Sequence, residues 1–121
     1  MINISMTPAA ADRLATYELQ SGDRIRLMYD SEGCGCAVSG VASLWLTDAL
    51  EPDELEAETN APALPMTYLK RQEVFFEDRL RLDYSPERRA FRLSSDGQIY
   101  GNGIAVTDRR GANRANEAAL R

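Results

Sequence analysis

The chain has 121 residues, a formal net charge of −5 and no histidine. About 120 residues is near the commonest size of a single domain, so one compact core is expected. Without histidine the chain cannot form a Ser-His-Asp or Cys-His catalytic group, a histidine general base, or a histidine-containing zinc or iron site. Most familiar hydrolase and oxygenase mechanisms are thereby excluded.

The sequence gives no sign of a membrane or nucleic-acid partner. No segment approaches the roughly 20 apolar residues of a membrane span, and the N-terminus lacks the basic and apolar regions of a signal peptide, so we expect a cytoplasmic protein. Residues 109–121 carry four Arg against Glu117, which leaves 10 basic and 18 acidic residues, a net −8, in residues 1–108. Such a body repels phosphate backbones.

The first expected elements are a short strand and a helix. Residues 2–4 alternate as in a strand, and Thr7-Pro8 is typical of the N-cap and first turn of a helix that runs to about Gln20. Three apolar residues with helical spacing are interpreted as core: Ala10, Leu14 and Tyr17.

A period-two pattern over residues 24–29 predicts a half-buried strand that leads into the loop Asp30 to Cys36, whose glycines disfavour regular structure. This loop contains both cysteines of the chain, Cys34 and Cys36. Thiolates are preferred ligands of Fe–S clusters, zinc and Cu(I), so both are candidate metal and cofactor ligands. A disulfide between them is the less favoured alternative, because its ring is strained and the cytosol is reducing.

A second strand is expected from Val41 to Thr47, with Trp45 in the core. Residues 48–58 follow and carry six carboxylates and no basic residue. A solvated loop and edge strand is the favoured interpretation of this segment, and a docking surface for a basic partner is the alternative. It lacks the residue pattern of a calcium loop.

In the second half, residues 67–72 are expected to form one helical turn, and residues 80–94 a hairpin around the turn at residues 85–88. Further elements are expected as strands at residues 74–76 and up to about Val106, and as turns at residues 96–97 and 101–103. Phosphate binding by Gly101 and Gly103 is disfavoured because no strand-to-helix context follows.

These patterns predict an α+β domain over residues 1–108, with one N-terminal helix packed on short, mostly antiparallel strands, and a flexible basic tail over residues 109–121. The large apolar residues of the strand segments are expected to contribute to or border one core: Ile25, Leu27, Leu44, Trp45, Leu46, Phe75, Leu82 and Phe91.

A short strand, a Thr-Pro-Ala-Ala-Ala helix, an Arg-Ile-Arg-Leu strand, and then Gly-Cys-Gly-Cys-Ala-Val before Leu-Trp-Leu follow one another in this chain. This order resembles the HesB-like, or A-type, iron–sulfur cluster biosynthesis family, and most of all a bacterial branch with an Asp-x-Glu-Gly-Cys-Gly-Cys loop. The likeness covers roughly residues 1–106 and depends mainly on residues 29–47. It implies a HesB-like fold for residues 1–108 and binding of Fe–S clusters or iron in oligomers.

The resemblance also implies a ligand set. Cys34 matches the family's loop cysteine, but the family's C-terminal Cys-Gly-Cys has no counterpart, since residues 95–121 contain no cysteine. Gln98 to Gly103 stand roughly where that pair would fall. Either Cys36 compensates for it, or this branch has lost cluster transfer.

Two functions are consistent with these residues. In the first, two chains of a homodimer supply Cys34 and Cys36 to one cluster, which usually takes four cysteines, and deliver it to Fe–S assembly or recipient proteins. Asp30, Glu32 and Tyr100 are candidates to complete the shell. In the second, the chain is a metal-free interaction module with packed or redox-sensitive cysteines and residues 48–58 as its working surface. No nucleophile–base pair is present, so no enzymatic activity is expected.

Overall fold

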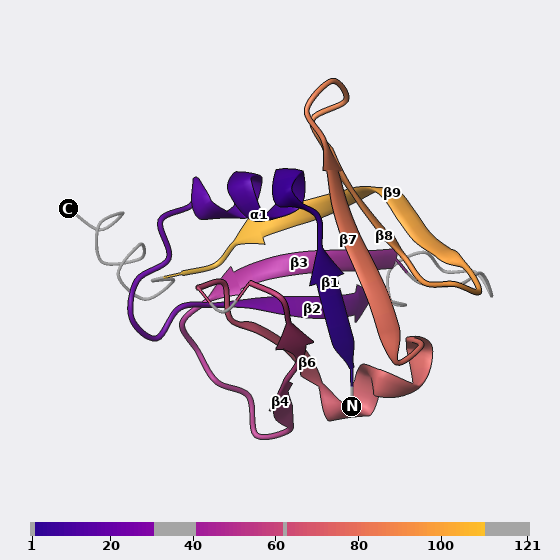
Figure 1. Ribbon diagram of the computed structural model, residues 1–121. Helices are drawn as coiled ribbons and strands as arrows, with labels where there is room; N and C mark the ends of the chain where they lie inside the picture. The colour runs from indigo at the N-terminus through magenta and orange to yellow at the C-terminus, as the bar shows by residue number, and fades with distance from the viewer. Residues whose placement is uncertain (1, 31–40, 62, 111–121) are drawn as a thin grey trace.

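The structure is a computed structural model that describes residues 2–30, 41–61 and 63–110. In this part of the chain one α-helix accompanies a strongly bent sheet, in which β1 and β7 run across the direction of β2 and β3 (Figure 1). The elements follow in the order β1 (Asn3–Met6), α1 (Pro8–Ala15), β2 (Arg24–Asp30), β3 (Val41–Thr47), β4 (Glu54–Glu56), β5 (Glu58–Thr59), β6 (Met66–Leu69), the 3-10 helix η1 (Lys70–Phe75), β7 (Arg79–Ser85), β8 (Ala90–Ser94) and β9 (Ile99–Asp108).

The sheet has nine described strands in the order β4-β6-β2-β3-β9-β8-β7-β1-β5. The pairs β2–β3, β4–β6, β7–β8 and β8–β9 are antiparallel, and the pairs β1–β5, β1–β7, β2–β6 and β3–β9 are parallel. The predicted α+β class is confirmed, with more parallel pairing than the sequence indicates. Hairpins leave turn signals in the sequence, whereas parallel partners are brought together by longer connections.

Helix α1 begins as predicted and ends earlier than predicted. The Thr7 hydroxyl accepts a hydrogen bond from the Ala10 amide (3.2 Å), and Pro8 is the first helical residue. The helix stops at Ala15 instead of near Gln20, because the Thr16 hydroxyl donates to a carbonyl of the last turn and the backbone turns away from helical geometry soon after. The predicted core residues of this segment pack as expected: Ala10 and Leu14 are fully buried and Tyr17 packs against them.

The antiparallel pair β2–β3 confirms both strands predicted in this region, with a register from Arg24↔Thr47 to Asp30↔Val41. Leu44 and Leu46 lie in the core, so Trp45 between them faces the other side of the sheet. Trp45 is half-buried there, with the Arg109 guanidinium 4.3 Å from its ring centroid. The expectation that Trp45 lies in the core is therefore wrong, because its side chain is on the opposite face of the sheet from the core cluster.

Residues 66–76 differ from the prediction. The expected helical turn at residues 67–72 is displaced toward the C-terminus, since β6 occupies residues 66–69 and η1 begins at Lys70. The expected strand at residues 74–76 is wrong, because η1 covers most of it. All four residues of β6 are buried, so the strand has no polar–apolar alternation to mark it. Phe75 is 42% exposed and does not belong to the core, whereas Phe76 does.

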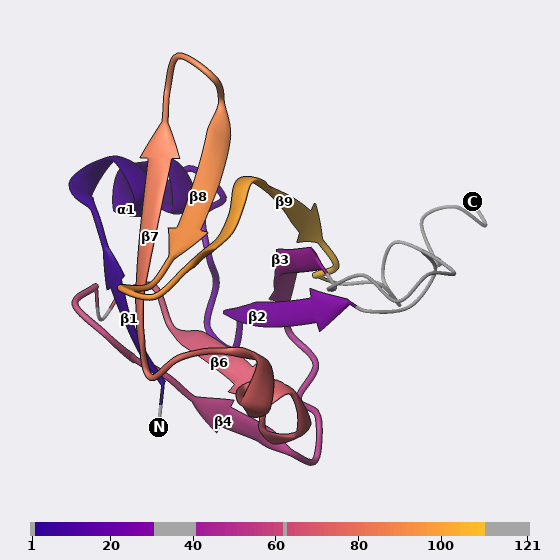
Figure 2. The same ribbon diagram turned by 90° about the vertical axis from the view of Figure 1, so that its right-hand side faces the viewer.

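Strand β9 joins the two halves of the sheet (Figure 2). Its residues 99–104 pair with β8 and its residues 105–108 pair with β3. The turn predicted at residues 101–103 is wrong, because this stretch is an irregular part of one continuous strand, where the pairing with β8 shifts register. Glycines inside a strand often mark such bulges. The hairpin predicted over residues 80–94 is confirmed as β7–β8.

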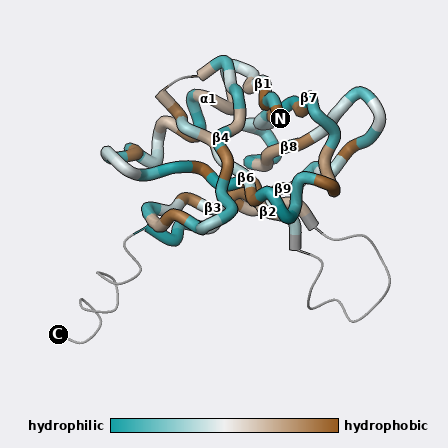
Figure 3. The backbone as a smooth tube through the Cα atoms, turned by 90° about the horizontal axis from the view of Figure 1, so that it is seen from below, coloured by the Kyte–Doolittle hydropathy of each residue, from teal (hydrophilic) through white to brown (hydrophobic). Residues whose placement is uncertain are grey.

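The core is one cluster built from both halves of the sheet and from α1. In Figure 3 polar and apolar colours alternate along several strands, as expected when one face of each strand packs inward. The cluster includes most of the predicted residues, namely Ile25, Leu27, Leu44, Leu46, Leu82 and Phe91.

The acidic segment supplies β4 and β5, which lie at the two ends of the sheet order. The predicted edge strand is therefore confirmed. Glu54 is an exception to the expected solvation, since its side chain is only 1% exposed and forms an ion pair with the equally buried Arg26. Glu54 therefore shields Arg26 of β2 from solvent.

The first two residues of the predicted tail contact the domain. The Arg109 amide donates to the Leu46 carbonyl (2.7 Å), and the Arg110 guanidinium pairs with Asp108 (2.8 Å) and Asp23 (3.3 Å). Residues 111–121 lie outside the described residues, so the boundary between domain and tail stays a prediction. In the described ranges no helix has the length and apolar character needed to cross a membrane.

Candidate functional site

The two candidate ligands lie between the ends of β2 and β3. Cys34, Cys36 and Glu32 are outside the described residues, which stop at residue 30 and resume at residue 41. Asp30 and Val41 are paired in the β2–β3 ladder, so the segment with the cysteines begins and ends at adjacent points of one hairpin. The prediction that a strand delivers the chain into this segment is confirmed.

A side-chain amide holds the end of β2. Gln72 of η1 accepts a hydrogen bond from the Tyr29 amide and donates one to the Tyr29 carbonyl, both at 2.9 Å. The neighbouring strand β6 pairs with β2 only at residues 25–27, and Gln72 extends this ladder by mimicking one more strand residue. The backbone is therefore fixed on both sides one residue before Asp30.

Four aromatic rings connect the end of β2 with the beginning of β9. Tyr29 is stacked on Phe75 with 4.3 Å between ring centroids, and its edge meets Phe76 at 5.6 Å. Phe76 in turn lies 5.3 Å from Tyr100 of β9. We call Tyr29, Phe75, Phe76 and Tyr100 the aromatic cluster. It makes the base of the cysteine segment a packed surface rather than an isolated strand end.

Tyr68 fixes η1 beneath this cluster. Burial raises the pKa of the Tyr68 hydroxyl, and the nearby Glu73 carboxylate raises it further, although a hydrogen bond with the backbone of Ile2 acts in the opposite direction. The hydroxyl therefore stays protonated at neutral pH and donates to Glu73 Oε2 at 3.1 Å. Because Glu73 lies between Gln72 and the exposed end of η1, this bond helps to position both.

Tyr100 is near the base of the segment and already has partners. Its hydroxyl oxygen accepts hydrogen bonds from the Glu77 amide (2.8 Å) and from Gln98 Nε2 (3.1 Å). A metal ligand in this position would have to give up or share these donors. Of the three residues expected to complete the ligand shell, the structure describes this side chain alone, and it has a structural role.

The positions that would match the family's C-terminal cysteine pair lie at the same end of the sheet as the cysteine segment. β3 begins at Val41, and β9 runs parallel to it with Ser43 opposite Ala105. The part of β9 before residue 105 is therefore next to the beginning of β3. The structure brings Gln98 to Gly103 into this region, but these residues have amide, aromatic and aliphatic side chains or none.

The sequence did not indicate Gln72 or the aromatic cluster. Gln72 pairs with the β2 backbone only because the folded chain brings it there, and a contact of this kind leaves no periodic signal in the sequence. The β-branched and aromatic residues at 74–76 were the only hint, and they were interpreted as a strand. In the described ranges there is no group of three or more His, Cys, Asp or Glu side chains placed to hold a metal ion.

Comparison with known proteins identifies the family to which the chain belongs. Residues 2–108 match the model of the family described as iron–sulphur cluster biosynthesis. The chain is 36% identical over 106 residues to the uncharacterized protein YqkB of Bacillus subtilis. The aligned region covers 87% of this chain and 97% of YqkB.

Solved structures show the same fold at low sequence identity. A Lactobacillus acidophilus protein, proposed to act in Fe–S biosynthesis, superimposes with a TM-score of 0.72 and 21% identity over 98% of this chain and 99% of its own. A crystal structure of IscA with a [2Fe–2S] cluster gives a TM-score of 0.56 and 17% identity over 84% and 97% of the two chains. The chain belongs to the iron–sulphur cluster biosynthesis family, and it has the HesB-like fold that its sequence predicts.

Proposed function

We propose that this protein carries an Fe–S cluster or iron, bound by Cys34 and Cys36 from each of two chains, and passes it to recipient proteins in the cytoplasm. The observation that carries this proposal is the position of the only two thiols of the chain, on a segment anchored at both ends by one strand pair in a family of Fe–S biosynthesis proteins. The protein acts as a carrier and not as a catalyst.

Ligand number supports a shared site. A cluster usually takes four cysteines, and one chain has two. Two copies related by a twofold axis supply four thiolates, because a symmetric interface presents the same patch from both sides. The cargo is then held only while the dimer exists, and a recipient's thiols can reach it by ligand exchange.

Exposed apolar side chains near the aromatic cluster support the same geometry. Val74 and Phe75 are 82% and 42% exposed, and Phe75 is the ring stacked on Tyr29. Ile99, next to Tyr100 in β9, is 52% exposed. A second chain that approaches the cysteine segment would cover such side chains, and their burial would favour association.

Anaerobic reconstitution with iron and sulfide tests the ligand assignment. Wild type is expected to retain iron and show visible absorbance, each of C34S and C36S to retain less, and the double variant to retain none, since serine offers a hard, poorly ionised oxygen. Equal iron in wild type and the double variant would overturn the ligand assignment, and a wild type that stays free of iron after reconstitution would favour a metal-free interaction module.

The shared geometry needs its own control. Val74→Lys places a charge in the proposed interface and is expected to reduce both dimer formation and iron retention. Leu50→Lys adds the same charge at a residue that is 71% exposed but follows the opposite end of β3, and it should change neither. Mass from light scattering, measured on the reconstituted samples, separates the outcomes: a cluster-bound monomer would overturn the shared site.

A further inference from the structure

A groove lies between α1 and the β7–β8 hairpin, neither of which contains a cysteine. Its hollow has a volume of about 550 Å³ and is lined by Ala9, Asp12, Arg13, Thr16, Tyr84, Pro86 and Arg89. A second hollow of about 410 Å³ continues it across Tyr17 and Phe91 and shares Arg13, Tyr84 and Arg89 with the first. Pockets of several hundred Å³ are the size that small organic ligands occupy.

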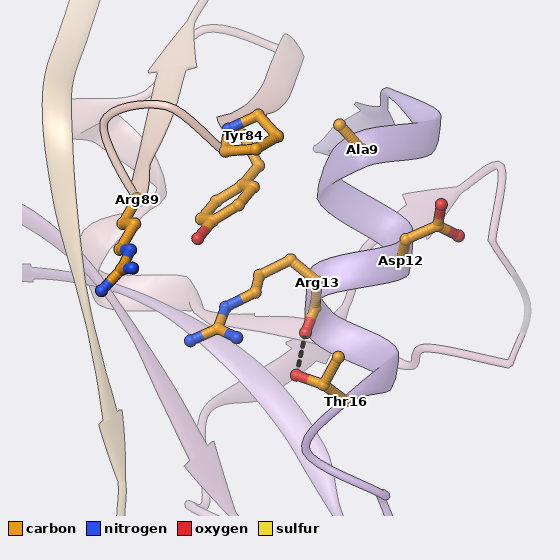
Figure 4. Close-up of a pocket in the computed structure, with 7 residues that line it drawn as sticks. Ala9, Asp12, Arg13, Thr16, Tyr84 and Arg89 are labelled. Atoms are coloured by element: carbon orange, nitrogen blue, oxygen red, sulfur yellow. Dashed lines mark hydrogen bonds between the residues drawn. The ribbon is translucent and has the colours of Figure 1, made fainter.

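Two guanidinium groups converge in this groove. Figure 4 shows Arg13 reaching from α1 and Arg89 from the hairpin, with both guanidinium groups near the Tyr84 hydroxyl. In the described part of the chain neither arginine forms an ion pair with a carboxylate. Asp12 also lines the groove, but its carboxylate points away from Tyr84 and Arg89 (Figure 4).

Aromatic rings hold this arrangement in place. The Arg13 guanidinium lies 5.6 Å from the ring centroid of Tyr17 and 5.7 Å from that of Tyr84. The Tyr84 ring also packs on Phe91, with 4.7 Å between the ring centroids. Arg13 is thus positioned by two rings, so less of its side-chain freedom is lost when a ligand binds.

Arg89 has an unusual backbone conformation for its residue type. Its φ of 53° lies in the left-handed region, which glycine or asparagine adopts at lower cost. The turn would therefore be less strained with glycine at this position, so the guanidinium is held there at some cost to the folded backbone. Such outliers often occur at ligand sites.

We propose that this groove binds a small molecule with a carboxylate or phosphate group attached to an apolar or aromatic body. The guanidinium groups of Arg13 and Arg89 and the Tyr84 hydroxyl provide donors for the oxyanion, and planar guanidinium groups suit its paired oxygens. Ala9, Pro86 and the ring of Tyr84 provide apolar contacts for the body. In a chain with a net charge of −5, two unpaired cations in one hollow give selectivity for an anion at this place.

Titration of the ¹⁵N-labelled full chain with phenyl phosphate, benzoate, inorganic phosphate and benzyl alcohol tests the proposal. With phenyl phosphate and benzoate, we expect saturable amide shifts at residues of the groove. Inorganic phosphate should bind at least fivefold more weakly, and benzyl alcohol should give no saturable shift. Failure of both aromatic anions to saturate any groove residue would overturn the proposal. A hexaglutamate peptide that binds the groove more tightly than either would also overturn it, in favour of a protein-docking surface.

Matched variants locate the site. R13Q and R89Q should each weaken binding of phenyl phosphate at least tenfold, whereas R88Q, which removes the same charge one residue away and outside the groove lining, should change it less than twofold. R89G should lose binding while its melting temperature stays equal to or above that of wild type, because the strained residue is replaced by glycine. Equal weakening by R88Q and R89Q would show nonspecific attraction and overturn the assignment.

Discussion

Arg26 and Glu54 form a buried ion pair across the β2–β6–β4 edge of the sheet, with Arg26 Nη2 2.6 Å from Glu54 Oε1. The two side chains are 4% and 1% exposed, and the same arginine nitrogen also donates to the Ala49 carbonyl. Arg24 contacts the other carboxylate oxygen at 3.7 Å. The acidic segment is therefore attached to the domain by a desolvated charge pair.

Removing the negative partner should be costly. E54Q leaves the Arg26 charge buried without its counter-ion, and we expect it to lower the free energy of unfolding by about 3–5 kcal/mol, as for other broken buried pairs. The comparison variant is R71Q, which breaks the Arg71–Asp53 pair of similar length (2.7 Å), whose side chains are 59% and 28% exposed. It should cost less than about 1 kcal/mol. Equilibrium urea unfolding measures both, and equal losses would contradict this account.

The same pair predicts an acid dependence of stability. Burial raises the pKa of Glu54, but the neighbouring Thr67 hydroxyl, the hydrogen bonds from the Glu51 amide and from Arg26, and the Arg26 charge outweigh it and hold the pKa below its ordinary value of 4.5. A lowered pKa in the folded state stabilises the protein above 4.5, and this contribution is lost as the pH falls through the folded-state pKa. The stability difference between wild type and E54Q should therefore shrink below pH 4.5. A constant difference from pH 7 to pH 3 would argue against it.

The Gln72 contact predicts local protection at the base of the cysteine segment. Q72A removes both hydrogen bonds to Tyr29, and we expect the Tyr29 amide to exchange with solvent at least tenfold faster, since each such bond contributes about 1 kcal/mol. The matched control is Q20A, whose side-chain amide donates to the exposed Glu18 carbonyl. Hydrogen exchange followed by NMR distinguishes them, and unchanged exchange of Tyr29 in Q72A would show that Gln72 does not hold the strand.

Two truncations locate the boundary of the folded domain. A chain that ends after Arg110 should unfold at the same denaturant concentration as the full chain, because the residues removed bring one large apolar side chain. A chain that ends after Asp108 should lose about 1–2 kcal/mol, since it lacks the backbone hydrogen bond of Arg109 and its contact with Trp45. If both truncations are neutral, the two arginines do not contribute to stability.

The sequence predicted elements whose signals are local. The Thr7-Pro8 helix start, the period-two strand at residues 24–29 and the hairpin at residues 80–94 all depend on neighbouring residues and were confirmed. The strand β6 was missed because it is buried on both faces, and Val74 to Phe76 resembled a strand although η1 occupies most of them. Arg26 alternated with apolar residues as a solvent-facing residue would, but Glu54 covers it from a distant segment.

The candidate site was predicted in part. The position of the cysteines between two strands followed from the flanking patterns, and the paired ends of β2 and β3 confirm it. The contacts of Tyr29 with Gln72 and Phe76 join segments more than 40 residues apart in the chain, and such contacts have no periodicity to detect. The ligand roles of Cys34 and Cys36 stay a prediction.

The central place of β9 has a consequence for synthesis of the protein. This strand is near the end of the domain in sequence but lies between β3 and β8 in the sheet. A nascent chain that has not yet released residues 99–108 from the ribosome presents β3 and β8 as two open edges, although both cysteines have already been synthesised. We therefore expect the proposed cluster to be loaded after chain release, since the edges of β3 and β8 are bridged only when β9 lies between them.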